Sequence, residues 1–172
     1  MRISAGVFRE DLGFDVREAN LLDHGDAEAF VMLLNAYIGD AMGGGSIIDG
    51  VLRKKLLADL QAHPSKLILL ARKGAAYVGM LVGFWGYSTF RVGPLLNIHD
   101  IVVLPVHRRQ GVARELMVSA EARAREDGCR KMTLEVRSDN DNARRLYLSL
   151  GYGECQPSMS FWMKSIDGSA CE

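Results

Sequence analysis

The sequence of 172 residues lacks an excess of charge of either sign, and it has little cysteine. Lysine plus arginine equals aspartate plus glutamate at 21 each, so no overall field would attract nucleic acid. The cysteines, Cys129, Cys155 and Cys171, are odd in number and show no CxxC spacing. Neither a disulfide framework nor a zinc site is therefore predicted, and we expect no metal and no nucleic-acid partner.

Long apolar runs are also missing. The longest, around residues 75–85, is too short to cross a bilayer and is interrupted by Gly79 and Gly83. Residues 1–13 mix charged with apolar side chains and lack the core of a signal peptide. We expect a cytoplasmic protein with no membrane partner. Its length fits one domain, at residues 14–166, with a loose segment at 1–13 and a tail at 167–172.

Strand and helix patterns alternate along the chain. A hairpin turned at Lys73 and Gly74 is predicted, and another strand begins at Gly93 and Pro94. Ser46 is expected to cap the second of four helices, after the glycine run 43–45. Strands are predicted at 14–18, 67–71, 77–87, 93–104, 131–136 and 158–164, and helices at about 27–37, 46–60, 112–127 and 140–150.

The most informative segment is the turn Arg108-x-x-Gly111-x-Ala113, which joins an apolar strand pattern to a helical pattern. The first turn of a helix offers unpaired N–H groups and the positive end of the helix dipole. Small residues there let a phosphate or pyrophosphate approach the backbone. A Walker A loop is excluded because Val112, Ala113 and Arg114 follow the glycine, and a dinucleotide fingerprint is excluded because only one glycine is present. An ordinary strand–helix connection is the alternative.

A second segment, residues 140–152, has apolar residues at helical spacing: Ala143, Leu146, Tyr147 and Leu150. One face of this helix is therefore expected to be buried. On spacing alone, packing accounts for Tyr147 better than catalysis does.

Together these segments resemble the GNAT superfamily of acetyl-coenzyme A-dependent N-acetyltransferases. The family pattern Arg/Gln-x-x-Gly-x-Gly/Ala appears at residues 108–113, after the strand segment 100–105 with its terminal proline. The later pattern Asn-x-x-Ala-x-x-Leu-Tyr-x-x-x-Gly-Phe/Tyr appears from Asn140 to Tyr152. The resemblance implies an α+β fold, a single domain whose central mixed, mostly antiparallel twisted sheet has helices on both faces.

The resemblance also implies a mechanism: an acetyl group moves from acetyl-coenzyme A to a primary amine by direct attack in a ternary complex. The pantetheine arm is expected beside the strand before the turn, in a splayed gap before the strand 131–136, with Asn140 also contacting it. Tyr147 corresponds to the general acid that protonates the leaving thiolate. The full set of expected cofactor-binding residues is Ile101, Val102, Val103, Arg108, Arg109, Gln110, Gly111, Val112, Ala113, Arg114, Asn140, Ala143 and Tyr147.

The base that deprotonates the amine is less clearly marked. Many relatives carry a glutamate where this chain has His99, followed by Asp100. Histidine titrates near neutral pH and can accept that proton directly or through water, but a hydrogen-bonded strand histidine is an equal alternative. The run Gly43–Gly45 is either a mobile lid of the acceptor site or a plain connection.

The acceptor is left open between a small molecule and a protein amine, and a homodimer is one possibility that the family raises. A non-catalytic acyl-coenzyme A sensor is the alternative function.

Overall fold

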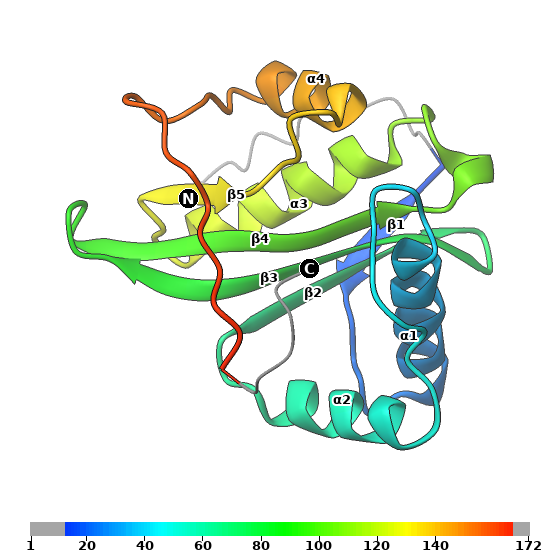
Figure 1. Ribbon diagram of the computed structural model, residues 1–172. Helices are drawn as coiled ribbons and strands as arrows, with labels where there is room; N and C mark the ends of the chain where they lie inside the picture. The colour runs from blue at the N-terminus through cyan, green and yellow to red at the C-terminus, as the bar shows by residue number, and fades with distance from the viewer. Residues whose placement is uncertain (1–12, 167–172) are drawn as a thin grey trace, which may run out of the picture. The chain divides into compact units, whose positions relative to one another are not determined.

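The computed structural model describes residues 13–166 (Figure 1). The predicted N-terminal segment, apart from Gly13, and the tail at 167–172 lie outside the described residues. The chain divides after Glu135 into two compact units. The first holds the sheet and three α-helices, and the second holds the helix α4 (Asp141–Ser149).

The first unit contains a five-stranded sheet in the order β1-β2-β3-β4-β5. Its first three strand pairs are antiparallel, and β5 is parallel to β4. The strands are β1 (Asp15–Glu18), β2 (Lys66–Lys73), β3 (Ala76–Ser88), β4 (Gly93–Val103) and β5 (Lys131–Leu134). The mixed, mostly antiparallel sheet expected from the family resemblance is confirmed.

Helices cover both faces of this sheet (Figure 1). On one face, α1 (His24–Ile38) and α2 (Gly50–Ala62) pack over a core that includes Phe30, Met80 and Val82. On the other, α3 (Val112–Glu126) lies so close that a Cβ on Gly79 would approach the side chains of Val112 and Leu116. Because side chains alternate along a strand, Gly79 and Met80 face opposite layers. No helix within residues 13–166 is long and apolar enough to cross a membrane.

A buried carboxylate fixes the start of α1. Asp26 accepts hydrogen bonds from the Arg17 guanidinium (Nη1, 2.7 Å), the Tyr77 hydroxyl (2.6 Å) and the Asn20 backbone N–H (2.9 Å). These partners tie α1 to β1 and β3. Burial alone would raise the pKa of Asp26, but the hydrogen bonds outweigh it and lower the pKa to about 2.

Two sequence predictions about element ends are wrong. The second helix begins at Gly50 and not at Ser46, because Asn35 hydrogen-bonds both the N–H and the C=O of Ile48 and keeps that segment out of the helix. The fifth strand ends at Leu134 and not at Val136, because β4 carries a bulge just beyond the last paired residue, Ile98.

The strand predicted at 158–164 is also wrong. The structure has no strand in this segment, whose large apolar side chains, Phe161 and Trp162 among them, are exposed. A strand needs a partner edge, and no ladder includes these residues. Their apolar character gave a strand-like pattern without specifying a neighbour.

Candidate active site

The turn between β4 and α3 has a backbone suited to an anion, and we call residues 109–114 the cradle. A short 3₁₀ turn, η1 (Pro105–His107), is followed by two residues in the left-handed region, Arg109 (φ 60°) and Gly111 (φ 92°). Left-handed geometry favours glycine, and a non-glycine residue held there is typical of a functional turn. No side chain caps the start of α3 at Gly111. The helix N-terminus is thus arranged to meet an anion with its backbone N–H groups.

The side chain of Arg108, the first residue of the motif, is hydrogen-bonded to two residues outside the cradle. Its Nε donates to the carbonyl oxygen of Val103 (3.0 Å), the last residue of β4, and its Nη2 donates to Asp40 Oδ2 (2.5 Å). The Arg108 guanidinium lowers the pKa of Asp40. Asp40 lies in the segment between α1 and α2, so this ion pair joins two segments 68 residues apart.

The parallel ladder between β4 and β5 ends where the resemblance predicts a gap. Leu95–Ile98 pair with Lys131–Leu134, and no β5 partner is present for the rest of β4 among the described residues. Backbone groups alternate in direction along a strand, so those of Val102 face β3 whereas those of Ile101 and Val103 face the side that β5 leaves unpaired. The Val103 C=O on that side accepts from Arg108 Nε. A strand-like arm of a ligand can hydrogen-bond to such groups as an added strand does.

A bulge in β4 brings His99 and Asp100 to the same face of the sheet. Val82 on β3 pairs with Asp100 and the next residue, Gly83, pairs with Ile98, so His99 is the extra residue. The His99 ring meets Phe84 edge to face, with ring centroids 5.9 Å apart, and its Nδ1 lies 3.5 Å from Asp100 Oδ2. Without the bulge these neighbours would point to opposite faces.

The two side chains differ in environment. The His99 side chain is 65% exposed, whereas that of Asp100 is 25% exposed. Burial raises the pKa of Asp100, and His99 opposes that shift. The result is an accessible imidazole held beside a carboxylate, the arrangement that suits a proton acceptor. Asp100 had no predicted role, although a carboxylate within an apolar strand pattern is a signal of a functional residue.

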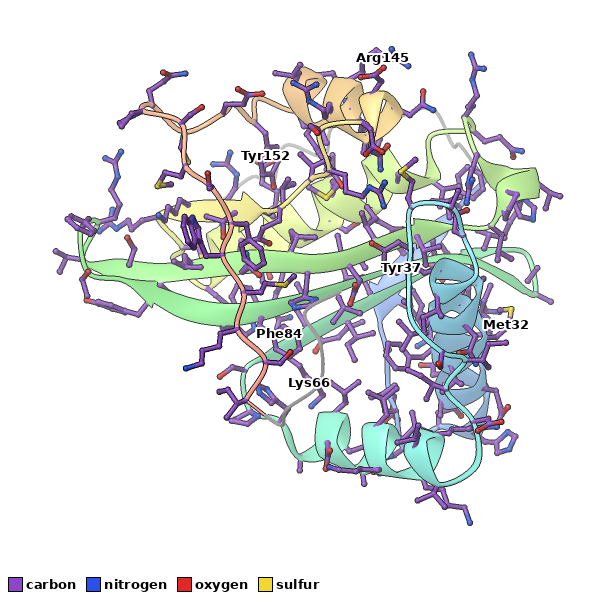
Figure 2. The ribbon with its side chains drawn as sticks, in the orientation of Figure 1. Met32, Tyr37, Lys66, Phe84, Arg145 and Tyr152 are labelled. Atoms are coloured by element: carbon purple, nitrogen blue, oxygen red, sulfur yellow. The ribbon has the colours of Figure 1, made fainter. Side chains whose placement is uncertain are left out.

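Tyr147, Asn140 and Ala143, the remaining expected site residues, lie in the second unit. The Asn140 side-chain oxygen accepts from the Ala143 N–H (3.2 Å) and caps α4. Tyr147 is buried, as the helical spacing predicted, and its ring lies 5.9 Å from that of Tyr152 (labelled in Figure 2). Gly151, with φ 87°, follows the end of this helix as predicted.

The segment 39–49 between α1 and α2 is pinned at several points. Asp40 holds Arg108 and also accepts from the Met42 N–H (3.0 Å). A Cβ on Gly43 would lie 1.9 Å from the carbonyl oxygen of Tyr37, so the chain passes directly against the end of α1. At the other end of the segment, the Asn35 side chain hydrogen-bonds the N–H and the C=O of Ile48. These contacts argue against a plain flexible connection.

No group of three His, Cys, Asp or Glu side chains within residues 13–166 is arranged to hold a metal ion.

A helix N-terminus opened by a left-handed glycine, next to a strand that loses its neighbour, is typical of a class of proteins that bind a ligand with a phosphate group and an extended arm. Within that class the family is clear. The model of the Acetyltransferase (GNAT) family matches residues 16–152, and the chain belongs to this family. It is an acyltransferase of the N-acetyltransferase type, and its family uses acetyl-coenzyme A.

Curated relatives agree with this membership. The chain is 29% identical to YhfO, an uncharacterized N-acetyltransferase of Bacillus subtilis, over 129 residues, which are 75% of this chain and 85% of the relative. It is 31% identical to the aminoglycoside N(6')-acetyltransferase type 1 of Acinetobacter haemolyticus over 111 residues, 63% of this chain and 76% of that protein. Over 97 residues, 56% of this chain and 60% of the relative, it is 32% identical to the thialysine N-epsilon-acetyltransferase of Caenorhabditis elegans.

Solved structures share the fold. An aminoglycoside acetyltransferase, meta-AAC0020, from an uncultured soil metagenomic sample, in complex with sisomicin, superposes with a TM-score of 0.74 at 19% identity, covering 90% of this chain and 99% of that one. AAC(6')-Iy in complex with the bisubstrate analogue CoA-S-monomethyl-acetylneamine gives a TM-score of 0.71 at 18% identity, covering 88% and 98%. At these identities the likeness establishes the fold.

Proposed function

We propose that this protein transfers an acetyl group from acetyl-coenzyme A to a primary amine of a small molecule, by direct attack in a ternary complex. The observation that carries the proposal is the cradle next to the unpaired end of β4. The family membership supports the reaction, and relatives named for aminoglycosides and thialysine support an amine acceptor of low molecular weight. In keeping with the sequence expectation, we place the activity in the cytoplasm.

The cradle and β4 would hold coenzyme A. Backbone N–H groups of the turn and of the first turn of α3, residues 109–114, are the donors for the pyrophosphate. The pantetheine arm would lie along residues 101–103 on the side that β5 leaves unpaired. Asn140 is proposed to reach the arm with its amide nitrogen, since its oxygen caps α4.

The amine requires a base. An alkyl amine with a pKa of about 10.4 is neutral in only about one molecule in 2,500 at pH 7, a cost of about 4.6 kcal/mol if no group accepts the proton. His99 is our candidate, acting directly or through water. Its exposure gives it access to substrate, and its Nδ1 lies 3.5 Å from Asp100 Oδ2.

The leaving thiolate requires an acid or a hydrogen-bond donor. We propose Tyr147 for this role because it occupies the tyrosine of the second motif. Its burial fits both this role and simple packing. If the protein is instead an acyl-coenzyme A sensor, it would bind the ligand at the cradle but would not catalyse acetyl transfer.

Calorimetry with coenzyme A on the Gly111→Trp variant tests the cradle. A tryptophan there strains a left-handed position and fills the approach to the donors, so binding should be lost. Gly128→Trp is the matched control, because Gly128 is also left-handed (φ 71°) but follows the opposite end of α3. A folded Gly111→Trp variant with the parent's affinity for coenzyme A would contradict the proposed site. Thiol release with a panel of amines then distinguishes the enzyme from the sensor.

A further inference from the structure

We infer that Arg108 is a positioning residue, held by Asp40, and not a ligand of the coenzyme A phosphates. The inference rests on the proposed function, because it assigns a different role to a residue of the same cradle. Its side chain fixes the end of β4 on one side and the 39–49 segment on the other. The cradle and this segment are thereby joined through one guanidinium.

The geometry of the guanidinium carries the first step. Its Nε and Nη2 donate to two different partners, Val103 O at 3.0 Å and Asp40 Oδ2 at 2.5 Å. An arginine side chain presents its donors in a rigid planar fork, so two such bonds define where the group lies. To bind a phosphate through these donors, Arg108 would have to release a strand-end carbonyl and a carboxylate together.

The partners are themselves held in place. The Asp40 carboxylate is only 19% exposed, and its second oxygen accepts from the Met42 N–H. Its backbone N–H donates to Tyr37 O (3.0 Å), and its C=O accepts from Gly43 N–H (2.9 Å). Asp40 is thus part of a rigid turn at the end of α1, and it offers Arg108 a fixed acceptor.

The position of Val103 explains what the bond to it does. Val103 ends β4, and the turn that follows leads through η1 to the left-handed residues Arg109 and Gly111. Arg108 reaches back across this turn to the strand end, so its side chain spans the turn. The bond closes residues 104–107 and so fixes the point from which the proposed donors, residues 109–114, begin.

The same contact acts on the segment 39–49. That segment is closed by Asn35 and Ile48 at its far end and by Asp40 at its near end. Residues 44–47 between these ties are exposed. Loss of the Asp40 tie should therefore loosen the segment as well as the cradle, which a role limited to binding phosphate does not predict.

The two roles of Arg108 predict opposite signs for one variant. If Asp40 positions Arg108, Asp40→Ala weakens coenzyme A binding, by about two- to fivefold for a partly exposed pair. If Arg108 is a phosphate ligand that Asp40 holds back, Asp40→Ala frees it and tightens binding. Asp49→Ala is the matched control. It removes an exposed carboxylate from the same segment, and the Asp49 side chain makes no cap hydrogen bond to α2.

The experiment combines calorimetry with coenzyme A and hydrogen exchange of residues 41–48 in the full chain. Parent, Asp40→Ala, Arg108→Ala and the double variant are compared. We expect weaker binding and faster exchange in each single variant, and a double variant no worse than the worse single one, since both changes break the same tie. Asp49→Ala should bind and exchange as the parent does.

Tighter binding in Asp40→Ala would overturn the inference, and so would parental exchange in both single variants. An Arg108→Ala variant that loses far more affinity than Asp40→Ala, with parental exchange, would identify a phosphate ligand. A parent that binds no coenzyme A would refute the proposed function. The exchange data would then still decide whether Asp40 and Arg108 hold the segment.

Discussion

The buried carboxylate of Asp26 allows a quantitative test of how α1 is held on the sheet. The perturbation is Asp26→Asn, which keeps the size of the side chain and removes its charge. In the folded protein this carboxyl has a pKa of about 2, against an ordinary value of 3.8, because hydrogen bonds from Arg17, Tyr77 and Asn20 outweigh the effect of burial. A shift of this size corresponds to about 2 kcal/mol of folding free energy.

The sign of the pH dependence follows from the direction of the shift. Between about pH 2 and pH 4 the unfolded chain binds a proton at Asp26 that the folded chain does not. The stabilisation is therefore complete above about pH 5 and is lost as the pH falls toward 2. In Asp26→Asn this contribution is absent at every pH, so the difference between parent and variant should shrink as the pH is lowered.

Thermal or urea unfolding at several pH values measures this difference. At pH 7 we expect a loss of about 2 kcal/mol, or about 4 to 8 °C in melting temperature for a chain of this size. Asp59→Asn is the control, since the Asp59 side chain is 62% exposed and pairs with Lys55 one turn away, a contact worth little. Equal destabilisation at pH 2.5 and pH 7, or less than about 0.5 kcal/mol at pH 7, would refute the reasoning.

The parts of the site that could be predicted are those fixed by local chemistry. The helix α3 starts at Val112, as the helical pattern after the small-residue turn predicted. The end of α4 before Gly151 was also predicted. In each case one or two neighbouring residues determine the backbone, so a short sequence window contains the information.

The parts that could not be predicted depend on residues far apart in the sequence. The bulge at His99 is defined by how β4 pairs with β3, which the β4 sequence alone does not specify. This bulge places His99 and Asp100 on one face of the sheet. The Asp40–Arg108 pair joins residues on different elements. Gly43 looked like part of a flexible run, yet it is required by the approach to Tyr37. Strand or helix periodicity carries no information on such contacts.

Two further variants test the chemistry proposed for the site. His99→Ala should lower turnover most near neutral pH and less at high pH, where free amine becomes abundant; a pH–activity profile shaped like the parent's would instead assign His99 to packing beside Phe84. Tyr147→Phe deletes the donor but keeps the ring that packs near Tyr152. A thiol with a pKa of about 8.5 is a poor leaving group as the bare anion at neutral pH, and a phenol can protonate it or stabilise its charge. Turnover should therefore fall by roughly a hundredfold or more, while melting temperature and coenzyme A affinity stay close to the parent's. If the variant keeps nearly parental turnover with a good acceptor, burial of Tyr147 is explained by packing alone, and the thiolate must leave without its help.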